Sequence, residues 1–79
     1  MIRDYYGIYD SVAKCYVQIF SEKNDQTAAR AFINVCKDKT TALGQSPEDY
    51  KLYKVANFDD ESGAFHNVEP EKIVEGKAE

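Results

Sequence analysis

The side chains that could carry out acid–base or metal chemistry are few in this sequence. The single histidine, His66, has no serine, cysteine or carboxylate near it at the spacing of a catalytic motif. A general base or a metal ligand is one interpretation of His66, and a histidine at the surface or edge of a sheet is the one we favour. The acidic run Asp59, Asp60 and Glu61 lacks the remaining ligand positions of a calcium loop, so we interpret it as a solvated turn.

The rest of the chain shows no enzymatic motif. It contains no glycine-rich phosphate loop, no GxSxG and no HExxH. Cys15 and Cys36 stand outside any CxxC pattern, and we interpret both as small buried hydrophobic residues, with a disulfide or a redox role as the alternative. We therefore expect no enzymatic activity, no metal site and no cofactor.

The chain is rich in aromatic residues, with six tyrosines and four phenylalanines. Many of them fall in predicted strands, where alternation turns some away from any covering helix. A sheet face with exposed rings between lysines and arginines can stack single-stranded bases and hold their backbone. The same tyrosines could instead pack against a second copy of the chain, because aromatic residues are also favoured at protein interfaces. The two interpretations are compatible.

Charge and length narrow the class of protein. The formal net charge of −4 weighs against a protein that coats nucleic acid by charge alone, although it leaves room for a local basic groove. A single domain of 79 residues has a small core, so we expect marginal stability unless it dimerises. No apolar run approaches the roughly 20 residues of a membrane span, and the opening MIRDYYG lacks the apolar core of a signal peptide. We expect a cytoplasmic protein without membrane contact.

The segment 24–39, NDQTAARAFINVCKDK, has the one clear helical period. Asn24 or Asp25 can cap its first turn, and Lys37 and Lys39 suit the negative end of the helix dipole. The apolar arc spans roughly 200° of the helical wheel. It consists of Ala28, Ala29, Ala31, Phe32, Ile33, Val35 and Cys36. So wide an arc predicts cover by sheet and loops together, or contact with a second chain.

Two strands are predicted before this helix, over residues 3–9 (RDYYGIY) and 14–20 (KCYVQIF), with a turn at Asp10 and Ser11. Alternation assigns the faces of each strand. In the first strand one face carries Tyr5, Gly7 and Tyr9, and the other carries Tyr6 and Ile8. In the second strand we expect the aliphatic side, Cys15, Val17 and Ile19, to meet the helix and the other side, Tyr16, Gln18 and Phe20, to face outward.

Two more strands are predicted after a loop that contains Gly44. Ser46 and Pro47 indicate one helical turn. Residues 50–58, YKLYKVANF, then form a strand, with a helix over 47–56 as the alternative. The run DDESG at 59–63 predicts a hairpin turn with Gly63 at positive φ, and 64–68 is the returning strand.

These elements predict an α+β fold: a mostly antiparallel sheet in the order strand-strand-helix-strand-strand, with one amphipathic helix packed on a face. We assign residues 1–68 to a single α+β domain. Residues 69–79 form an acidic C-terminal tail that can add one short edge strand.

Three stretches carry a family resemblance: YYGIYDSVA at 5–13, FSEKNDQTAARAF at 20–32 and SPEDYKLYKVANFDDESGAF at 46–65. In this order and spacing they resemble the small non-structural protein of gokushovirus-type microviruses, a family of single-stranded DNA phages. The residues that match the family's pattern are Tyr6, Asp10, Phe20, Asn24, Asp25, Ala28, Arg30, Phe32, Pro47, Asp49, Tyr50, Leu52, Phe58, Asp59, Ser62 and Gly63.

The resemblance implies a DNA-binding protein that assists the switch from double-stranded replication to single-stranded genome synthesis and packaging. It implies single-stranded DNA as the ligand, the host cytoplasm as the location, and phage or host replication proteins as further partners. A protein–protein adaptor of the same machinery, without direct DNA contact, is the alternative. We also expect a homodimer.

The candidate DNA-binding residues combine basic and aromatic side chains of the predicted strands. They are Arg3, Lys14, Lys51 and Lys54 for phosphates, and Tyr6, Tyr16 and Tyr53 for stacking. Arg30, on the polar side of the predicted helix, either pairs with a carboxylate such as Asp25 or Asp59 or reaches a phosphate.

Overall fold

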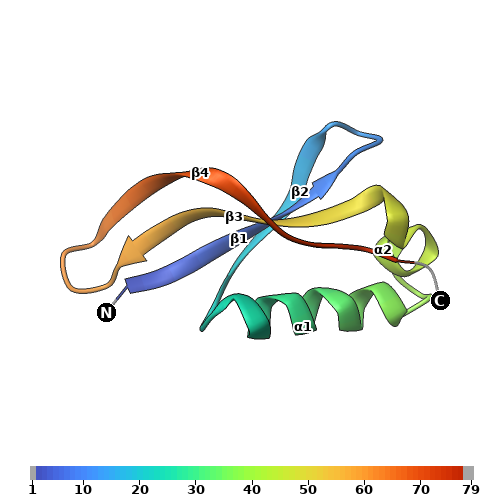
Figure 1. The fold of residues 1–79 in the computed structure, drawn as a ribbon, viewed down its shortest axis with the longest axis horizontal. Helices are drawn as coiled ribbons and strands as arrows, with labels where there is room; N and C mark the ends of the chain where they lie inside the picture. The colour runs from blue at the N-terminus through green and yellow to red at the C-terminus, as the bar shows by residue number, and fades with distance from the viewer. Residues whose placement is uncertain (1, 78–79) are drawn as a thin grey trace.

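The computed structural model describes residues 2–77 and confirms an α+β fold, with a four-stranded antiparallel sheet and one long helix along one face of it (Figure 1). The elements in chain order are β1 (Ile2–Asp10), β2 (Cys15–Glu22), α1 (Asp25–Lys37), α2 (Ala42–Gln45), the 3-10 helix η1 (Pro47–Asp49), β3 (Tyr50–Asp59) and β4 (Ala64–Glu75). Across the sheet the strand order is β2-β1-β3-β4. Two hairpins, β1–β2 and β3–β4, are therefore joined through their first strands.

Helix α1 begins at a capping box. The backbone N–H of Thr27 donates to Oδ1 of Asn24 over 2.9 Å, and the backbone N–H of Asn24 donates to Oγ1 of Thr27 over 3.2 Å. The acidic Asp25 lies in the first turn and the basic Lys37 in the last, as the helix dipole favours. The predicted helix is confirmed, and Asn24 is its cap.

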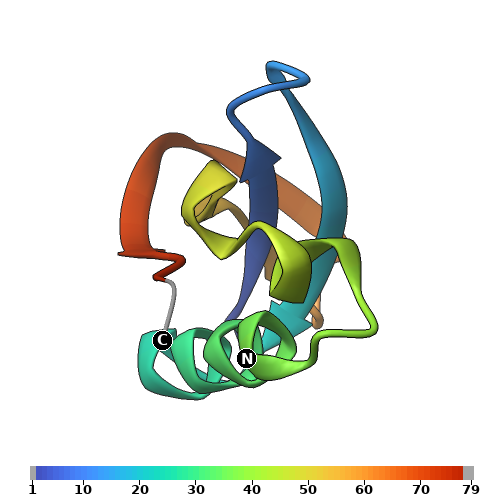
Figure 2. The same cartoon turned by 90° about the vertical axis from the view of Figure 1, so that its right-hand side faces the viewer.

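Helix α1 lies along one face of the sheet (Figure 2). The core lies between the two, on the face that carries Tyr6 and Ile8. The buried side chains are Tyr6, Ile8, Ala28, Phe32, Cys36 and Leu52. Burial of each large one contributes about 1.5–3 kcal/mol. Ile33 and Val35, from the same apolar arc, are each 39 % exposed, so the sheet and loops cover the arc only in part.

Two short helices connect α1 to β3. The predicted turn after Ser46 is η1, while α2 is an element that the sequence did not predict, because four residues are too few to show a period. A Cβ atom on Gly44 would lie 1.8 Å from the carbonyl oxygen of Asp38, so only glycine allows α2 this close to the end of α1. The alternative of a helix over 47–56 is not adopted, because β3 occupies 50–59.

A bulge in β2 reverses the expected facing of that strand. Ile8 pairs with Gln18 but Tyr9 pairs with Tyr16, which leaves Val17 as the extra residue. Tyr16 therefore lies away from α1, as predicted, whereas Phe20 pairs with Tyr6 and packs against the core.

The expectation that Cys15, Val17 and Ile19 meet the helix is wrong, because the bulge turns Ile19 to the other face, where it is 63 % exposed opposite Gly7. Cys15 is also exposed, so the interpretation of both cysteines as buried holds for Cys36 alone.

The fourth strand is longer than predicted. The turn after Asp59 has Gly63 at a φ of 77°, as expected, and β4 then continues through Glu75. Residues 71–75 pair with residues 51–54 of β3, with register shifts along the way. The expected boundary at residue 68 thus falls inside β4, and the expected edge strand is the second half of it.

The side of the sheet opposite α1 carries no helix in the part of the chain that the structure describes (Figure 1). We call this side the open face. Between residues 2 and 77, no helix has the length and apolar character that crossing a bilayer requires.

A polar network fixes the start of α1 to the sheet. The Tyr6 hydroxyl donates to Oδ1 of Asp25 over 2.6 Å, and Nζ of Lys54 lies 3.0 Å from the same oxygen and 3.7 Å from Oδ2 of Asp4. The Tyr6 hydrogen bond and then Lys54 hold the pKa of Asp25 below its usual range. Burial, followed by Asp25, raises the pKa of Tyr6, so the phenol stays protonated and keeps donating.

Replacement of Asp25 by Ala should lower the free energy of unfolding at pH 7 by about 1–3 kcal/mol, because the buried Tyr6 hydroxyl loses its acceptor. The pKa of Asp25 is lower in the folded chain, so its contribution is complete above the ordinary carboxyl pKa of about 3.9 and disappears as the pH falls through the folded value. Urea unfolding at neutral and at strongly acidic pH measures the difference.

The matched control is Glu48→Ala, which removes an exposed carboxylate in η1 and should change stability by less than about 0.5 kcal/mol at either pH. A penalty for Asp25→Ala that stays the same at both pH values would contradict this role of the network.

Candidate nucleic-acid interface

The centre of the open face is Gly7, between Tyr5 and Tyr9 on β1. A Cβ atom at this position would lie 2.8 Å from Cδ1 of Tyr16 and 3.4 Å from a methyl group of Val55. The absence of a side chain therefore gives the Tyr16 ring room to lie directly over the β1 backbone. This close approach sets where the aromatic rings on the open face gather.

Three tyrosines from three strands form one group of rings, which we call the Tyr16 cluster: Tyr9, Tyr16 and Tyr53. The ring centroids are 5.1 Å apart for Tyr9 and Tyr16, 6.1 Å for Tyr9 and Tyr53, and 6.0 Å for Tyr16 and Tyr53. All three contacts are edge-to-face, which is a favoured geometry for aromatic pairs. Tyr16 is still 45 % exposed, so part of its ring is free to contact a ligand.

The Tyr16 phenol is uncharged at neutral pH. Burial against its neighbours, followed by the nearby Tyr53 and Tyr9, raises its pKa above the usual value. The exposed part of the Tyr16 ring is therefore neutral, which is the state that suits stacking on a base.

A second group of rings, the Phe65 cluster, lies nearer the β3–β4 turn and contains Tyr5, Phe58 and Phe65. The centroids of Phe58 and Phe65 are 4.6 Å apart, and Tyr5 lies 5.4 Å from Phe65 and 6.4 Å from Phe58. Phe65 is 62 % exposed. The open face thus has two separate places where an aromatic ring is accessible.

Two lysines flank the Tyr16 cluster. Lys51 pairs with Tyr9 across the strands, and Lys72 pairs with Tyr53. Glu75 lies opposite Lys51 in the register of β3 and β4. Its carboxylate makes an ion pair with Lys72, and this contact raises the pKa of Lys72 and lowers that of Glu75. A phosphate in this position would replace one carboxylate as the partner of these lysines.

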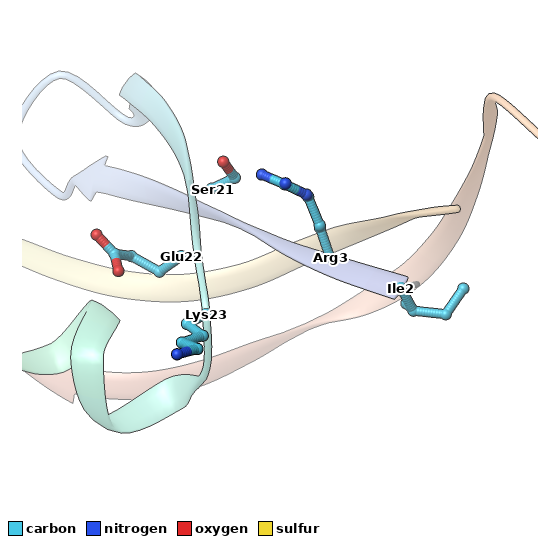
Figure 3. A pocket seen from close by; sticks show the side chains of 5 residues that line it. All are labelled: Ile2, Arg3, Ser21, Glu22 and Lys23. Atoms are coloured by element: carbon cyan, nitrogen blue, oxygen red, sulfur yellow. The ribbon is translucent and has the colours of Figure 1, made fainter. Parts of the chain in front are cut away.

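An arginine flanks the Phe65 cluster. Arg3 pairs with Phe58 across β1 and β3, and its Nε lies 3.7 Å from Oδ2 of Asp60. Figure 3 shows Arg3 and Ser21 projecting to the same side, at a shallow pocket that is also lined by Ile2, Glu22 and Lys23. With 58 % of its side chain exposed, Arg3 can exchange Asp60 for a phosphate.

The structure brings four of the predicted site residues to the open face or its ends. Arg3, Lys51, Tyr16 and Tyr53 lie on it. Lys14 is exposed in the turn between β1 and β2, at a φ of 60°, so it lies at the end of the hairpin and apart from the clusters.

Two of the predicted residues lie on the other side of the sheet. Tyr6 is 0 % exposed under α1, which leaves no ring face for a base, and Lys54 is held by Asp25 and Asp4. We therefore correct the assignment by removing both from the candidate interface. Arg30 is exposed on α1 and forms no ion pair within residues 2–77, so its expected pairing with Asp25 or Asp59 is not seen.

Sequence reasoning missed five residues of this face: Tyr5, Tyr9, Phe58, Phe65 and Lys72. Tyr9 shares a face with Tyr5 and Gly7, and the alternation could have selected it in place of Tyr6. Phe65 lies opposite Phe58 across the Gly63 turn, so the hairpin itself was a signal. No sequence signal points to Lys72, because the sequence predicts a tail over residues 69–79.

The remaining candidates for chemistry take structural roles. His66 is exposed on β4 and pairs with Asn57. Asp59 Oδ1 accepts from the backbone N–H of Glu61 over 3.0 Å, and this bond lowers the pKa of Asp59. Within residues 2–77 no group of three or more histidine, cysteine or acidic side chains is arranged to hold a metal ion.

Comparison with known proteins gives one family match. The family model described as "Phage ORF5 protein" matches residues 3–78, which is nearly the whole chain. Searches of curated proteins and of solved structures gave no match.

Proposed function

The chain belongs to the Phage ORF5 protein family, and on that premise we propose that it is a non-enzymatic phage protein that binds single-stranded DNA through the open face of its sheet. In this proposal it acts in the host cytoplasm. There it assists the switch from double-stranded replication to single-stranded genome synthesis and packaging.

The observation that carries the proposal is the pair of aromatic clusters on a sheet face that no helix covers in the described part of the chain. Tyr16 and Phe65 are the most accessible rings of the two clusters. Aromatic side chains on a sheet stack single-stranded bases without regard to sequence, and each stacked base contributes about 1–3 kcal/mol. Tyr5 and Tyr9 are four residues apart on β1, which corresponds to about 13 Å along a strand. One extended strand of DNA can therefore reach both clusters.

The distribution of charge supports the same face despite the net charge of −4. Four carboxylates lie on the α1 side of the sheet or at the start of the helix: Asp4, Glu22, Asp25 and Glu71. The cations Arg3, Lys51 and Lys72 lie on the open face. Glu75 also lies on the open face, opposite Lys51, so a phosphate that approaches this face meets these cations together with the carboxylate that partners Lys72.

A second function has its own supporting observation. Ile19 and Phe65 are the most exposed large apolar side chains of the open face. Stacking on a base uses the Phe65 ring and gives no reason for the exposed aliphatic Ile19. An exposed aliphatic residue beside tyrosines is typical of protein interfaces. The alternative is therefore an adaptor that contacts phage or host replication or packaging proteins through this face and does not touch DNA.

Fluorescence anisotropy of a labelled single-stranded oligonucleotide tests the proposal. We expect saturable binding that exceeds binding to the matching duplex. Tyr16→Ala should weaken the affinity roughly 5- to 150-fold, which corresponds to the loss of about 1–3 kcal/mol of stacking. Tyr16→Phe keeps the ring and should bind as the wild type does. The absence of any signal at low salt would sink the DNA proposal and favour the adaptor.

The salt dependence of the same titration distinguishes two neighbouring lysines on β3. Lys51→Gln should reduce the slope of log K against log salt concentration by about 0.7, the value for one phosphate contact on a single strand. Lys54→Gln should leave this slope unchanged and reduce only the folding stability, since Lys54 is bound to Asp25 on the other side. Equal effects of the two substitutions on the slope would show that the DNA does not select the open face.

A further inference from the structure

Strand β2 forms one edge of the sheet, and within residues 2–77 β1 is its single strand neighbour (Figure 2). Its outer backbone N–H and C=O groups are available to another strand. The six residues from Cys15 to Phe20 carry no charge. Edge strands are usually protected against pairing by charged residues or proline, and in this respect β2 is unprotected.

The other edge, β4, has that protection. Between residues 69 and 75 it contains Glu69, Pro70, Glu71, Lys72 and Glu75. Proline has no N–H to donate to a neighbouring strand, and alternating charges disfavour a contact between strands from which water is excluded. The two edges therefore differ in charge: β2, although it carries the bulge at Val17, has no charged residue or proline between Cys15 and Phe20.

The surface around β2 is apolar on both sides of the edge. On the strand itself Tyr16, Val17 and Ile19 are exposed. On the α1 side a cleft of about 150 Å³ separates β2 from the helix. Its lining residues are Ile8, Gln18, Phe20, Ala31, Phe32 and Val35. Apolar surface thus continues from the edge strand onto the flank of α1, which is the part of the helical arc that the sheet leaves uncovered.

We propose that β2 pairs antiparallel with β2 of a second copy of this chain, which gives a twofold-symmetric dimer with one continuous eight-stranded sheet. An antiparallel pair of identical strands is self-complementary, as a twofold interface requires. Antiparallel alignment also places Lys14, at one end of the strand, near Glu22 of the partner subunit, at the other. The opposite charges at the ends favour this alignment.

The uncharged edge strand lets a second copy approach despite the net charge that the two copies share. Each copy has a formal net charge of −4, so two copies repel one another except where they meet at an uncharged surface. The segment from Cys15 to Phe20 is such a surface. A standard interface buries about 800 Å² per partner, a modest part of the 5247 Å² of surface of this chain. Since the core contains six buried residues between residues 2 and 77, an interface of that size adds substantially to the apolar area removed from water.

The dimer also has a consequence for the open face. The twofold axis of an antiparallel strand pair is perpendicular to the sheet, so the two open faces lie on the same side and the two α1 helices on the other. Because Tyr16 belongs to β2, the two Tyr16 clusters lie next to one another across the dimer axis. This consequence rests on the proposed function, whereas the dimer itself does not.

Sedimentation velocity of the full chain without DNA tests the dimer. We expect a concentration-dependent dimer, and Val17→Lys should raise its dissociation constant tenfold or more. Val35→Lys and Ile33→Lys form a matched pair, since both residues are on α1 and equally exposed. Val35 lies beside β2 and Ile33 lies beside Val74 of β4. Val35→Lys should weaken the dimer, and Ile33→Lys should leave it intact.

A thiol probe provides a second measurement on the unmodified chain. Cys15 in β2 is exposed in the single chain, whereas Cys36 is buried, which raises its pKa and slows its reaction. The reaction of Cys15 with a thiol reagent should slow as the protein concentration rises through the dissociation constant. A monomer at all concentrations up to about 1 mM, Cys15 reactivity independent of concentration, or equal weakening by Val35→Lys and Ile33→Lys would overturn the proposal. Each of these results is independent of whether DNA binds.

Discussion

One helix can cover only one face of a sheet, and the rest of this structure depends on that constraint. Helix α1 packs Phe32 against Tyr6 and Leu52, and these three side chains are fully buried. The network of Tyr6, Asp25 and Lys54 then fixes where the helix begins. Since the chain has no second long helix between residues 2 and 77, the tyrosines of the other face stay accessible. The proposed function follows from that uncovered face.

The constraint also separates the charges. Carboxylates gather around the start of α1, where the positive end of the helix dipole and Lys54 stabilise them. Arg3, Lys51 and Lys72 are left on the open face among the aromatic rings. An acidic protein can therefore offer cations among aromatic rings to DNA, because net charge says nothing about where the charges lie.

Local rules of the sequence predicted the elements well. The 3.6-residue period and the Asn24 cap predicted α1, and Gly63 predicted the β3–β4 turn. Alternation separated Tyr6 from Tyr5 and Tyr9 correctly. It could not tell which of the two faces the helix covers, and Tyr6 and Lys54 lie on the covered face, where Tyr6 is buried and Lys54 is bound to Asp25.

The errors that remain arise from pairing between strands. The bulge at Val17 depends on how β2 fits β1, and beyond it Phe20 packs against the core while Ile19 lies on the open face. The second half of β4 has little apolar alternation of its own, and its pairing with β3 makes it a strand. Both features depend on contacts between distant segments, which a local pattern does not contain.

The central claim is that single-stranded DNA binds the open face, and nuclear magnetic resonance tests it most directly. Isotope-labelled protein would be titrated with an unlabelled single-stranded oligonucleotide while the backbone amide signals are followed. The account predicts that the largest shifts map to β1, β2 and β3 around Gly7 and Tyr16 and to the start of β4 at Phe65, with small shifts along the exposed side of α1. Shifts centred on α1 near Arg30, or an unchanged spectrum at saturating DNA, would contradict it.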